Sequence, residues 1–325
     1  MKLNKIVAYA IMGAGLAFSA TLQAQNTYPN APVRMVVGFP PGGISDVLAR
    51  AVANEAAKEL GQSIIVENRP GAGTTIAAGQ VARAKPDGYT LLFQDLTTHA
   101  INASLYKKLA YDTIEDFTPI ATVSTSPLLL VASSKSPTQS VKQLIDEISA
   151  KPGDYSYGTS GNGTIIHLAS EAMNQANKLD VVHIPYGGSA ALITATMTGD
   201  LKYAFSSMPP AVAQIQAGSL RGLAVTTPER VSILPDVPTI REAGVPEAEF
   251  VLYSGVLAPA GVPTDVADTL NKAFQKASQS QAVRDVYRNL GASPAYMTQE
   301  QITQLLQSEI QRYATIVETA GVQTN

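Results

Sequence analysis

The sequence feature that most constrains the fold is a three-part unit that recurs along the chain: an apolar run, a glycine-rich turn and a helical stretch. In its first copy, the run Val33–Phe39 leads through Phe39-Pro-Pro-Gly-Gly-Ile-Ser-Asp46 into a helix that continues to about Leu60. Either Ser45 or Asp46 is expected to cap this helix. Short β-branched runs that alternate with amphipathic helices are typical of a parallel sheet with helices on both faces. We therefore expect an α/β protein.

Four turns of this kind lie at residues 39–46, 68–75, 158–165 and 185–190. In open α/β sheets such turns gather at the carboxyl ends of the strands, where ligands bind. Glycines let the backbone come close to a ligand, and the free amides and positive dipole of a helix N-terminus favour an anion. One such turn can equally be a plain strand-to-helix connection. Four of them, split between two parts of the chain, favour a binding cleft.

Two long apolar stretches interrupt this alternation, at residues 121–133 and 250–259. Neither belongs to a strand–helix unit, so both are expected to cross between two lobes. Lobe 1 is then formed by residues 25–125 and 250–325, which include amphipathic helices at about 264–278 and 298–319, and lobe 2 by residues 126–249. A chain of 325 residues is long enough to give each lobe its own core.

Residues 1–24 have the pattern of a cleaved secretory signal. Lys2 and Lys5 precede an apolar run from Val7 to Phe18, and small residues stand before Gln25. A membrane anchor is the alternative, but this run is much shorter than the roughly 20 residues of a spanning helix. The chain also contains no Cys, which excludes disulfides and thiolate chemistry. We expect a periplasmic protein whose stability comes from core burial.

The overall charge argues against nucleic-acid binding, because the formal net charge is −3 and no basic run occurs. Phosphate-binding and dinucleotide motifs are also incomplete. Gly71-Ala-Gly73 lacks the third glycine of a dinucleotide fingerprint, and no G-x-x-x-x-G-K sequence is present. We expect no cofactor.

Catalytic motifs are equally incomplete. Gly158-Thr-Ser-Gly-Asn162 ends in Asn where the nucleophile elbow needs Gly, although His99, His167 or His183 could still serve as a base. His167 and Glu171 have the spacing of two metal ligands on a helix, but no second pair accompanies them. The chain is thus rich in backbone donors and short of reactive groups, which favours binding over catalysis, with no metal.

Sequence blocks along the whole chain after the expected signal resemble one family, the Bug-type receptors. These are the periplasmic solute-binding proteins of tripartite tricarboxylate transporters. The blocks that carry the resemblance are residues 28–46, Val66–Gly73, Ala84–Thr90, Glu115–Ile120, Tyr157–Thr164 with His167, His183–Ser189, Arg221–Thr227 and Leu234–Thr239. The resemblance implies a type II periplasmic-binding-protein fold, with two α/β lobes joined by two crossing strands and a ligand cleft between them.

The resemblance also implies a ligand, a small carboxylate, and a set of residues around it. Family members hold a carboxylate at the turn after the first strand and at the matching turn of the second lobe. The candidate ligand-binding residues are Pro41, Gly42, Gly43, Ile44, Ser45, Asp46, Gly73, Thr74, Gln94, Thr97, Ser160, Gly161, Asn162, Gly163, Thr164, His167, Tyr186 and Gly187. For Asp46 a purely structural role is the alternative, because an acid repels an anion; for His167 it is support of the loop, and for Tyr186 core packing.

The expected partners are the integral membrane subunits of a tripartite transporter, which would receive the ligand from a monomeric receptor. Two other functions remain open on the sequence alone. One is an enzyme that acts on a small organic acid, and the other is a ligand-sensing module without transport.

Overall fold

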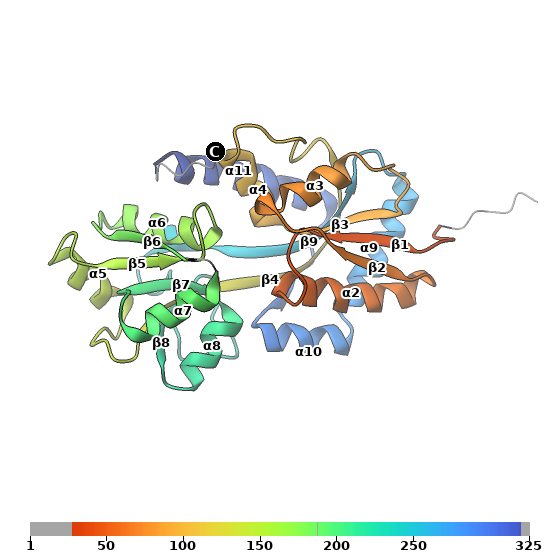
Figure 1. Cartoon of the computed structure of the whole chain (residues 1–325). Coiled ribbons are helices and arrows are strands. Elements are labelled where there is room, and N and C mark those ends of the chain that lie inside the picture. Colours follow the sequence, from red (N-terminus) through yellow and green to blue (C-terminus); the bar gives the residue numbers. More distant parts are fainter. Residues whose placement is uncertain (1–27, 187, 320–325) are drawn as a thin grey trace, which may run out of the picture.

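The computed structural model describes residues 28–186 and 188–319, and Figure 1 shows their arrangement. The expected signal segment and the candidate site residue Gly187 lie outside the described residues. The molecule is an α/β protein, as predicted, with two halves that lie side by side (Figure 1). The residue limits proposed for the two lobes stay predictions.

The first half is built on three parallel strands with β1 in the middle. Alternate residues of β1 face opposite layers: Val33 and Met35 pack in one apolar cluster with Leu48, and Val36 packs in another with Ala77. The elements of this half are β1 (Val33–Val37), α2 (Ile44–Leu60), β2 (Ile64–Asn68), η1 (Ala72–Thr74), α3 (Thr75–Ala82), β3 (Thr90–Asp95), α4 (Leu96–Leu105), α9 (Thr264–Ser278), α10 (Gln281–Leu290) and the short β10 (Ser293–Pro294).

The second half repeats this plan, because β5 pairs in parallel with both β6 and β7. Its core is apolar and includes the fully buried side chains of Tyr157, Tyr203 and Phe205. The elements are α5 (Val141–Ser149), β5 (Ser156–Thr159), α6 (Ile165–Ala176), β6 (Val182–Pro185), α7 (Ser189–Thr198), β7 (Tyr203–Ser207), α8 (Met208–Gln216), β8 (Leu220–Val225) and η2 (Pro246–Ala248).

Two antiparallel strands, β4 (Phe117–Ser133) and β9 (Val251–Pro259), run between the halves, at the two stretches where crossings were predicted. β9 pairs with β3 of the first half, and β4 pairs with β7 and β8 of the second. The strand order is therefore β2-β1-β3-β9-β4-β7-β5-β6 in one continuous sheet. β4 begins at Phe117 rather than Ala121, because Phe117 still pairs with Pro259.

Three helices were not predicted: α4, α5 and α10. α4 follows β3 directly, without a glycine-rich turn, since the Asp95 carboxylate caps it by accepting from the Thr98 amide at 2.9 Å. The last helix, α11 (Gln299–Thr319), packs mainly on α4 and also contacts α6 of the second half. The C-terminal segment therefore touches both halves.

The close approach of β4 and β9 leads to a stability prediction at Gly255. A Cβ atom at Gly255 would lie 2.8 Å from the carbonyl oxygen of Ala121 and 2.8 Å from a methyl group of Leu96. We expect Gly255→Ala to lower the free energy of unfolding, measured with urea, by about 1–3 kcal/mol. As a control, Gly79→Ala in α3 meets its nearest atom at 3.5 Å, so it should be neutral or stabilise by about 0.5–1 kcal/mol. Equal effects of the two substitutions would contradict this packing.

Candidate functional site

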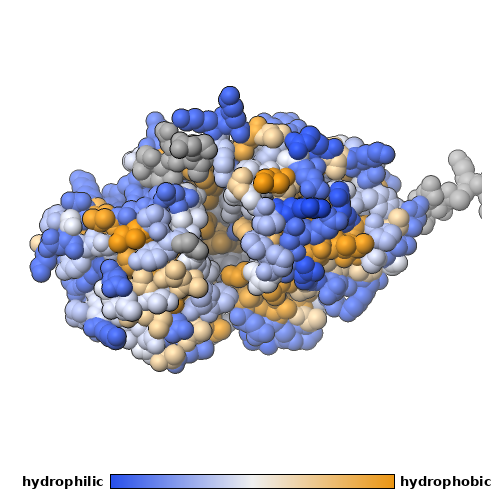
Figure 2. All heavy atoms as spheres, in the orientation of Figure 1, coloured by the Kyte–Doolittle hydropathy of each residue, from blue (hydrophilic) through white to orange (hydrophobic). Residues whose placement is uncertain are grey.

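A cavity of about 870 Å³ lies between the two halves, and Figure 2 shows a hollow at this place in the middle of the visible face. Loops and first helical turns that follow the strands form most of its lining. The first half contributes Phe39, Pro40, Pro41, Gly42, Gly43, Ile44, Ser45, Gly73, Thr74, Asp95, Thr98, Ile101, Asn102, Leu105, Tyr106 and Leu290. The second half contributes Ser160, Asn162, Gly163, Thr164, Ile165, Ser189, Ser207, Met208, Pro209 and Pro210, and the crossing strands add Ser126, Pro127, Leu252 and Ser254.

Within the described chain, six helices begin at this cavity: α2, α3, α4, α6, α7 and α8. Each follows one strand of a parallel trio, so the carboxyl ends of both trios point at the same space. The first amides of a helix have no carbonyl partner within it, and the helix dipole places a partial positive charge there. The cavity therefore favours an anion.

Charged side chains contribute almost nothing to this wall. Among the described lining residues, Asp95 is the only one with a charged side chain, and Lys, Arg and His do not occur. An anion in the cavity would therefore be held by backbone amides and by neutral side chains such as Ser45, Ser160 and Asn162.

The turn at residues 39–46 is braced from behind by Asp46. Gly42 turns the chain at φ +79°, and its amide donates to the Asp46 carboxylate at 2.9 Å. Burial alone would raise the pKa of Asp46, but hydrogen bonds from Arg50, Gly42 and Asn68 hold the pKa below its ordinary value. Asp46 is buried outside the cavity lining. The Gly42 amide is thus already used, and the free amides of this turn begin after it.

The expected cap of α2 was wrong. Gly43 occupies the N-cap position in an extended conformation, without any side-chain cap, and the helix begins at Ile44. Ser45 is then the second helical residue, and its side chain lines the cavity. The first amides of α2 are therefore left for a ligand, because neither Ser45 nor Asp46 caps them.

The second turn of the first half contains a strained residue, Thr74. Its φ of +75° is unfavourable for a β-branched side chain, at a cost of about 1–3 kcal/mol. The Thr74 hydroxyl accepts a hydrogen bond from the amide of Gln94, which is fully buried. The side chain also packs against Gly38, where a Cβ atom would lie 2.6 Å from that of Thr74. Gln94 therefore supports the wall without lining it.

In the second half, Thr164 holds the loop at residues 160–164. Its hydroxyl caps α6 by accepting from the His167 amide at 3.3 Å and donates to the Gly161 carbonyl at 2.9 Å. Behind the loop, Nδ1 of His167 accepts from the Gly163 amide at 3.1 Å. His167 therefore supports the loop from below, and it does not line the cavity.

His167 stacks on His183, with the ring centroids 4.1 Å apart. Burial lowers the pKa of each ring to about 4, and the charge of His167 adds to the effect on His183. Both rings are thus neutral at pH 7. Glu171, the second residue of the metal pair considered above, instead accepts from the Tyr157 hydroxyl. The described residues contain no group of three His, Asp or Glu side chains placed to hold a metal ion.

The structure brings most of the candidate site residues to the cavity. Those that line it are Pro41, Gly42, Gly43, Ile44, Ser45, Gly73, Thr74, Ser160, Asn162, Gly163 and Thr164. Asp46, Gln94, Thr97, Gly161, His167 and Tyr186 lie outside the lining. Thr97 faces β9, where its hydroxyl donates to the Val251 carbonyl at 3.1 Å. Tyr186 is partly buried and packs against the apolar core of the second half. Contact with a ligand stays a prediction for the whole set.

Sequence reasoning missed two parts of the wall. The first is the face of α4 that carries Asp95, Thr98, Asn102 and Tyr106, whose spacing of three or four residues is a helical signal. The second is the start of α8, at residues 207–210, where Pro in the first turn marks a helix start. Each of these helices follows a strand of a parallel trio, so the rule that ligands bind at the carboxyl ends of such strands applies to them as well.

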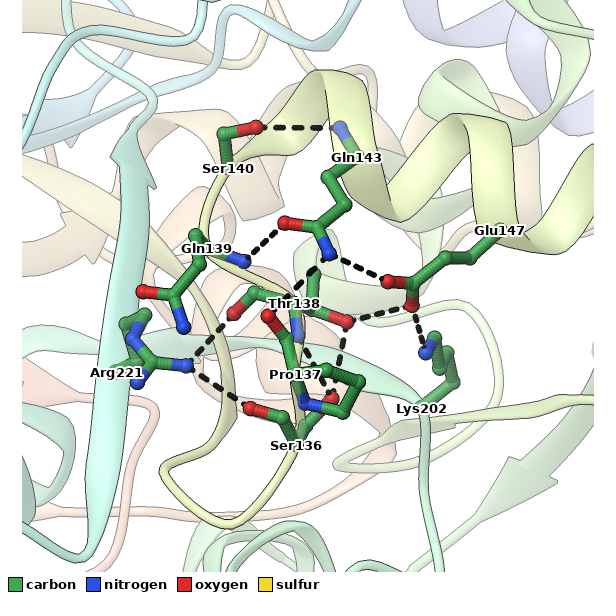
Figure 3. A network of polar contacts seen from close by, with 9 residues as sticks. All are labelled: Ser136, Pro137, Thr138, Gln139, Ser140, Gln143, Glu147, Lys202 and Arg221. Atoms are coloured by element: carbon green, nitrogen blue, oxygen red, sulfur yellow. Dashed lines mark hydrogen bonds and ion pairs between the residues drawn. The ribbon is translucent and has the colours of Figure 1, made fainter.

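A smaller hollow of about 400 Å³ lies at the other side of the second half, partly lined by Ser136 and Lys202. Figure 3 shows the polar network beside it. The Lys202 ammonium pairs with Glu147, and Arg221 donates to the carbonyls of Ser136 and Thr138 at 3.1 and 2.7 Å. These cations hold the connection between β4 and α5, so this hollow is a weaker candidate for an anion site than the cavity between the halves.

Comparison with known proteins identifies the family of this chain. A family model described as "Tripartite tricarboxylate transporter family receptor" matches residues 48–322. The chain belongs to this family. The receptor is 34% identical to Protein BugT of Bordetella pertussis over 98% of each chain. The family consists of periplasmic solute-binding receptors without enzymatic activity, and the cavity is the candidate for the binding site.

Solved structures share the fold of this receptor. The periplasmic binding protein BugD is 31% identical and matches with a TM-score of 0.77, over 92% of this chain and all of its own. MatC of Rhodopseudomonas palustris, solved with bound malate, is 33% identical, with a TM-score of 0.76 over 89% of this chain and all of its own. A second R. palustris protein, solved with adipate, is also 33% identical, with a TM-score of 0.79 over 91% of this chain and 99% of its own.

The helices within residues 28–186 and 188–319 are all too short or too polar to cross a membrane.

The three buried histidines lead to a prediction on pH. Burial lowers the pKa of His99, His167 and His183 from 6.5 to about 4. The unfolded chain therefore binds more protons between about pH 6.5 and pH 4, and these groups make the folded state less stable as the pH falls through that range. We expect the melting temperature of His167→Asn to fall less than that of the wild type between pH 7 and about pH 4.5, because Asn can still accept from Gly163 but does not titrate there.

Asp95 has the opposite effect on stability as the pH falls, since burial raises its pKa from 3.8 to about 6. Both proteins contain Asp95, so its contribution cancels when their melting temperatures are compared. Equal falls in melting temperature for the two proteins would show that protonation of His167 is not linked to unfolding.

Proposed function

We propose that this receptor binds a small organic acid in the cavity between its halves and delivers it to the integral membrane subunits of a tripartite tricarboxylate transporter. The observation that carries the proposal is that six helix N-termini of the described chain meet at one cavity whose described lining contains no cation. The malate and adipate held by two solved relatives support a carboxylate ligand. The family description supports the transporter as partner.

The first carboxylate anchor in this proposal is the start of α2. The Gly42 amide is taken by Asp46, so the amides of Gly43, Ile44 and Ser45 are the donors that remain. They point out of the helix end, where the dipole adds to their attraction for an anion. From the opposite wall Ser160 and Asn162 offer a hydroxyl group and a side-chain amide, while Thr164 holds their loop, and bridging water can complete the contact.

Closure of the two halves around the acid is part of the same proposal. The halves are joined through β4 and β9, a connection that can act as a hinge. They also touch beside the cavity: a Cβ atom at Gly163 of the second half would lie 2.7 Å from a methyl group of Leu105 in the first. A ligand held by both anchors would therefore favour the closed arrangement. Export to the periplasm through the N-terminal segment and action as a monomer complete the proposal.

The first test is a measurement of the melting temperature of refolded, ligand-free protein against a panel of compounds. The panel contains aliphatic and aromatic acids with one to three carboxylates, together with amino acids, sugars and nucleotides. A ligand of the folded state stabilises it by about 2.7 kcal/mol at a concentration of 100 times its Kd. We expect the shift to be confined to carboxylates. A shift produced only by sugars or nucleotides would reject the proposed anchor.

Ile44→Pro tests the α2 anchor directly. Proline removes the Ile44 amide but is tolerated at the first helical position, and Gly43 already has the extended conformation that a residue before proline prefers. A hydrogen bond to a charged group contributes about 1.5–3 kcal/mol, so the carboxylate should bind about ten times more weakly or worse. Isothermal titration calorimetry measures the change.

Two further variants serve as controls. Ile44→Ala reports the loss of the side chain alone, and Gln281→Pro makes the same backbone change at the first position of α10, away from the cavity. We expect Gln281→Pro to bind like the wild type. An Ile44→Pro protein that binds as tightly as Ile44→Ala would show that this amide does not hold the ligand.

A further inference from the structure

One of the six helix ends at the cavity differs from the others. The N-terminus of α4 is capped by a carboxylate, since Asp95 accepts from the Thr98 amide at 2.9 Å. The N-cap residues of the other five helices are neutral: Gly43, Thr74, Thr164, Gly188 and Ser207. The positive end of α4 is thus already occupied by a negative charge that belongs to the protein.

No lining cation of the described chain offsets this charge. The elements packed around Asp95 offer neutral groups, namely Gln94 on β3, Thr97 on α4 and Ser254, which pairs with Asp95 across β3 and β9. On α11, burial raises the pKa of the Tyr313 hydroxyl, and the nearby negative charges of Glu309 and, more weakly, Asp95 add to the shift. Asp95 therefore lines the cavity with hydrogen bonds from its own helix but, among the described lining residues, with no cation beside it.

The ionisable groups beside Tyr313 are Arg312 and Glu309. Arg312 donates to the carbonyl of Glu249, lies over the ring of Phe250 and is 3.8 Å from the carboxylate of Glu309. Burial raises the pKa of Asp95 itself to about 6, although hydrogen bonds from Thr98 and Thr97 oppose the shift. At pH 7.5 Asp95 is thus mostly ionised, at a cost that a second negative charge nearby would increase.

We propose that Asp95 is a specificity-determining residue, which selects an acid with one carboxylate and a hydrogen-bond donor at its other end. This inference rests on the proposed function, with the single carboxylate of the ligand at the α2 anchor. A hydroxyl, amide or ammonium group can donate to the Asp95 carboxylate, which only accepts when ionised. A second carboxylate at the same place meets the like charge of a buried side chain. The receptor thus differs from its relatives solved with malate and adipate, which are both dicarboxylates.

The test uses acids of equal length that differ only in the distal group. One series compares succinate with 4-hydroxybutyrate and 4-aminobutyrate, and a second compares adipate with 6-hydroxyhexanoate and 6-aminohexanoate. Calorimetric titration at pH 7.5 gives each Kd for the wild type. We expect the better of the two donor-bearing acids of a series to bind at least about ten times more tightly than the dicarboxylate, a difference of about 1.4 kcal/mol.

Asp95→Asn removes the charge and keeps a side chain that caps helices equally well. We expect this variant to bind the dicarboxylates about ten times more tightly than the wild type, and so to reduce or reverse the preference. Asp112→Asn is the matched control, because the Asp112 carboxylate also accepts two backbone amides, at 2.8 Å each, but lies outside the cavity lining. It should leave every Kd unchanged.

The pH dependence gives a second readout. Proton uptake by Asp95 should accompany dicarboxylate binding in the wild type. The affinity of the wild type for adipate should therefore fall as the pH rises from about 6 to about 8, while the affinity of Asp95→Asn should stay level. The inference would be overturned by a wild type that prefers the dicarboxylates, or by an Asp95→Asn protein that keeps the wild-type ratio. If no carboxylate in the panel bound to either protein, the proposed function itself would fail, and this inference with it.

Discussion

Parallel pairing in both halves is the constraint on which the rest of the structure depends. In each half a central strand, β1 or β5, is flanked by two parallel neighbours, and every strand of these trios is followed at once by a helix. Since parallel strands end at the same edge of a sheet, the helices of a trio must begin together. The crossing strands β4 and β9 then set the two edges face to face. A positive potential in the cavity therefore follows from the path of the backbone, before any side chain is chosen.

Much of this arrangement could be predicted, because strand and helix patterns depend on local residue order. The stretch around Val33 forms a strand where the apolar run placed it, and both crossings follow from apolar stretches outside any strand–helix unit. α4 escaped because its start has no glycine: the Asp95 cap replaces the turn chemistry that marked the other helices. The sequence left the roles of Asp46 and His167 open between ligand contact and structural support, for a different reason. A polar residue near a turn can lie buried behind the wall or can contact the cavity. Its sequence context is the same in both cases, and only the tertiary packing decides between them.

The supporting residues show how a wall of neutral groups can be rigid. Asp46, Gln94 and His167 each lie behind one of the loops, and each holds it by hydrogen bonds: to the Gly42 amide, the Thr74 hydroxyl and the Gly163 amide. Their own polar groups are thus largely turned away from the ligand. Fixed donors bind an anion without having to reorganise, so the affinity of such a site depends on residues that never touch the ligand.

A cavity of this kind also has a thermodynamic advantage when it is empty. A buried Arg or Lys without its anion costs several kcal/mol in lost hydration, whereas helix amides at an open cavity remain accessible to water. Backbone amides hold a carboxylate in the same way whatever acid carries it, so they do not distinguish one acid from another. Discrimination therefore falls to the side chains farther along the wall, on α4 and at the start of α8. A single charge there, such as that of Asp95, has a large effect because no other charged side chain of the described wall competes with it.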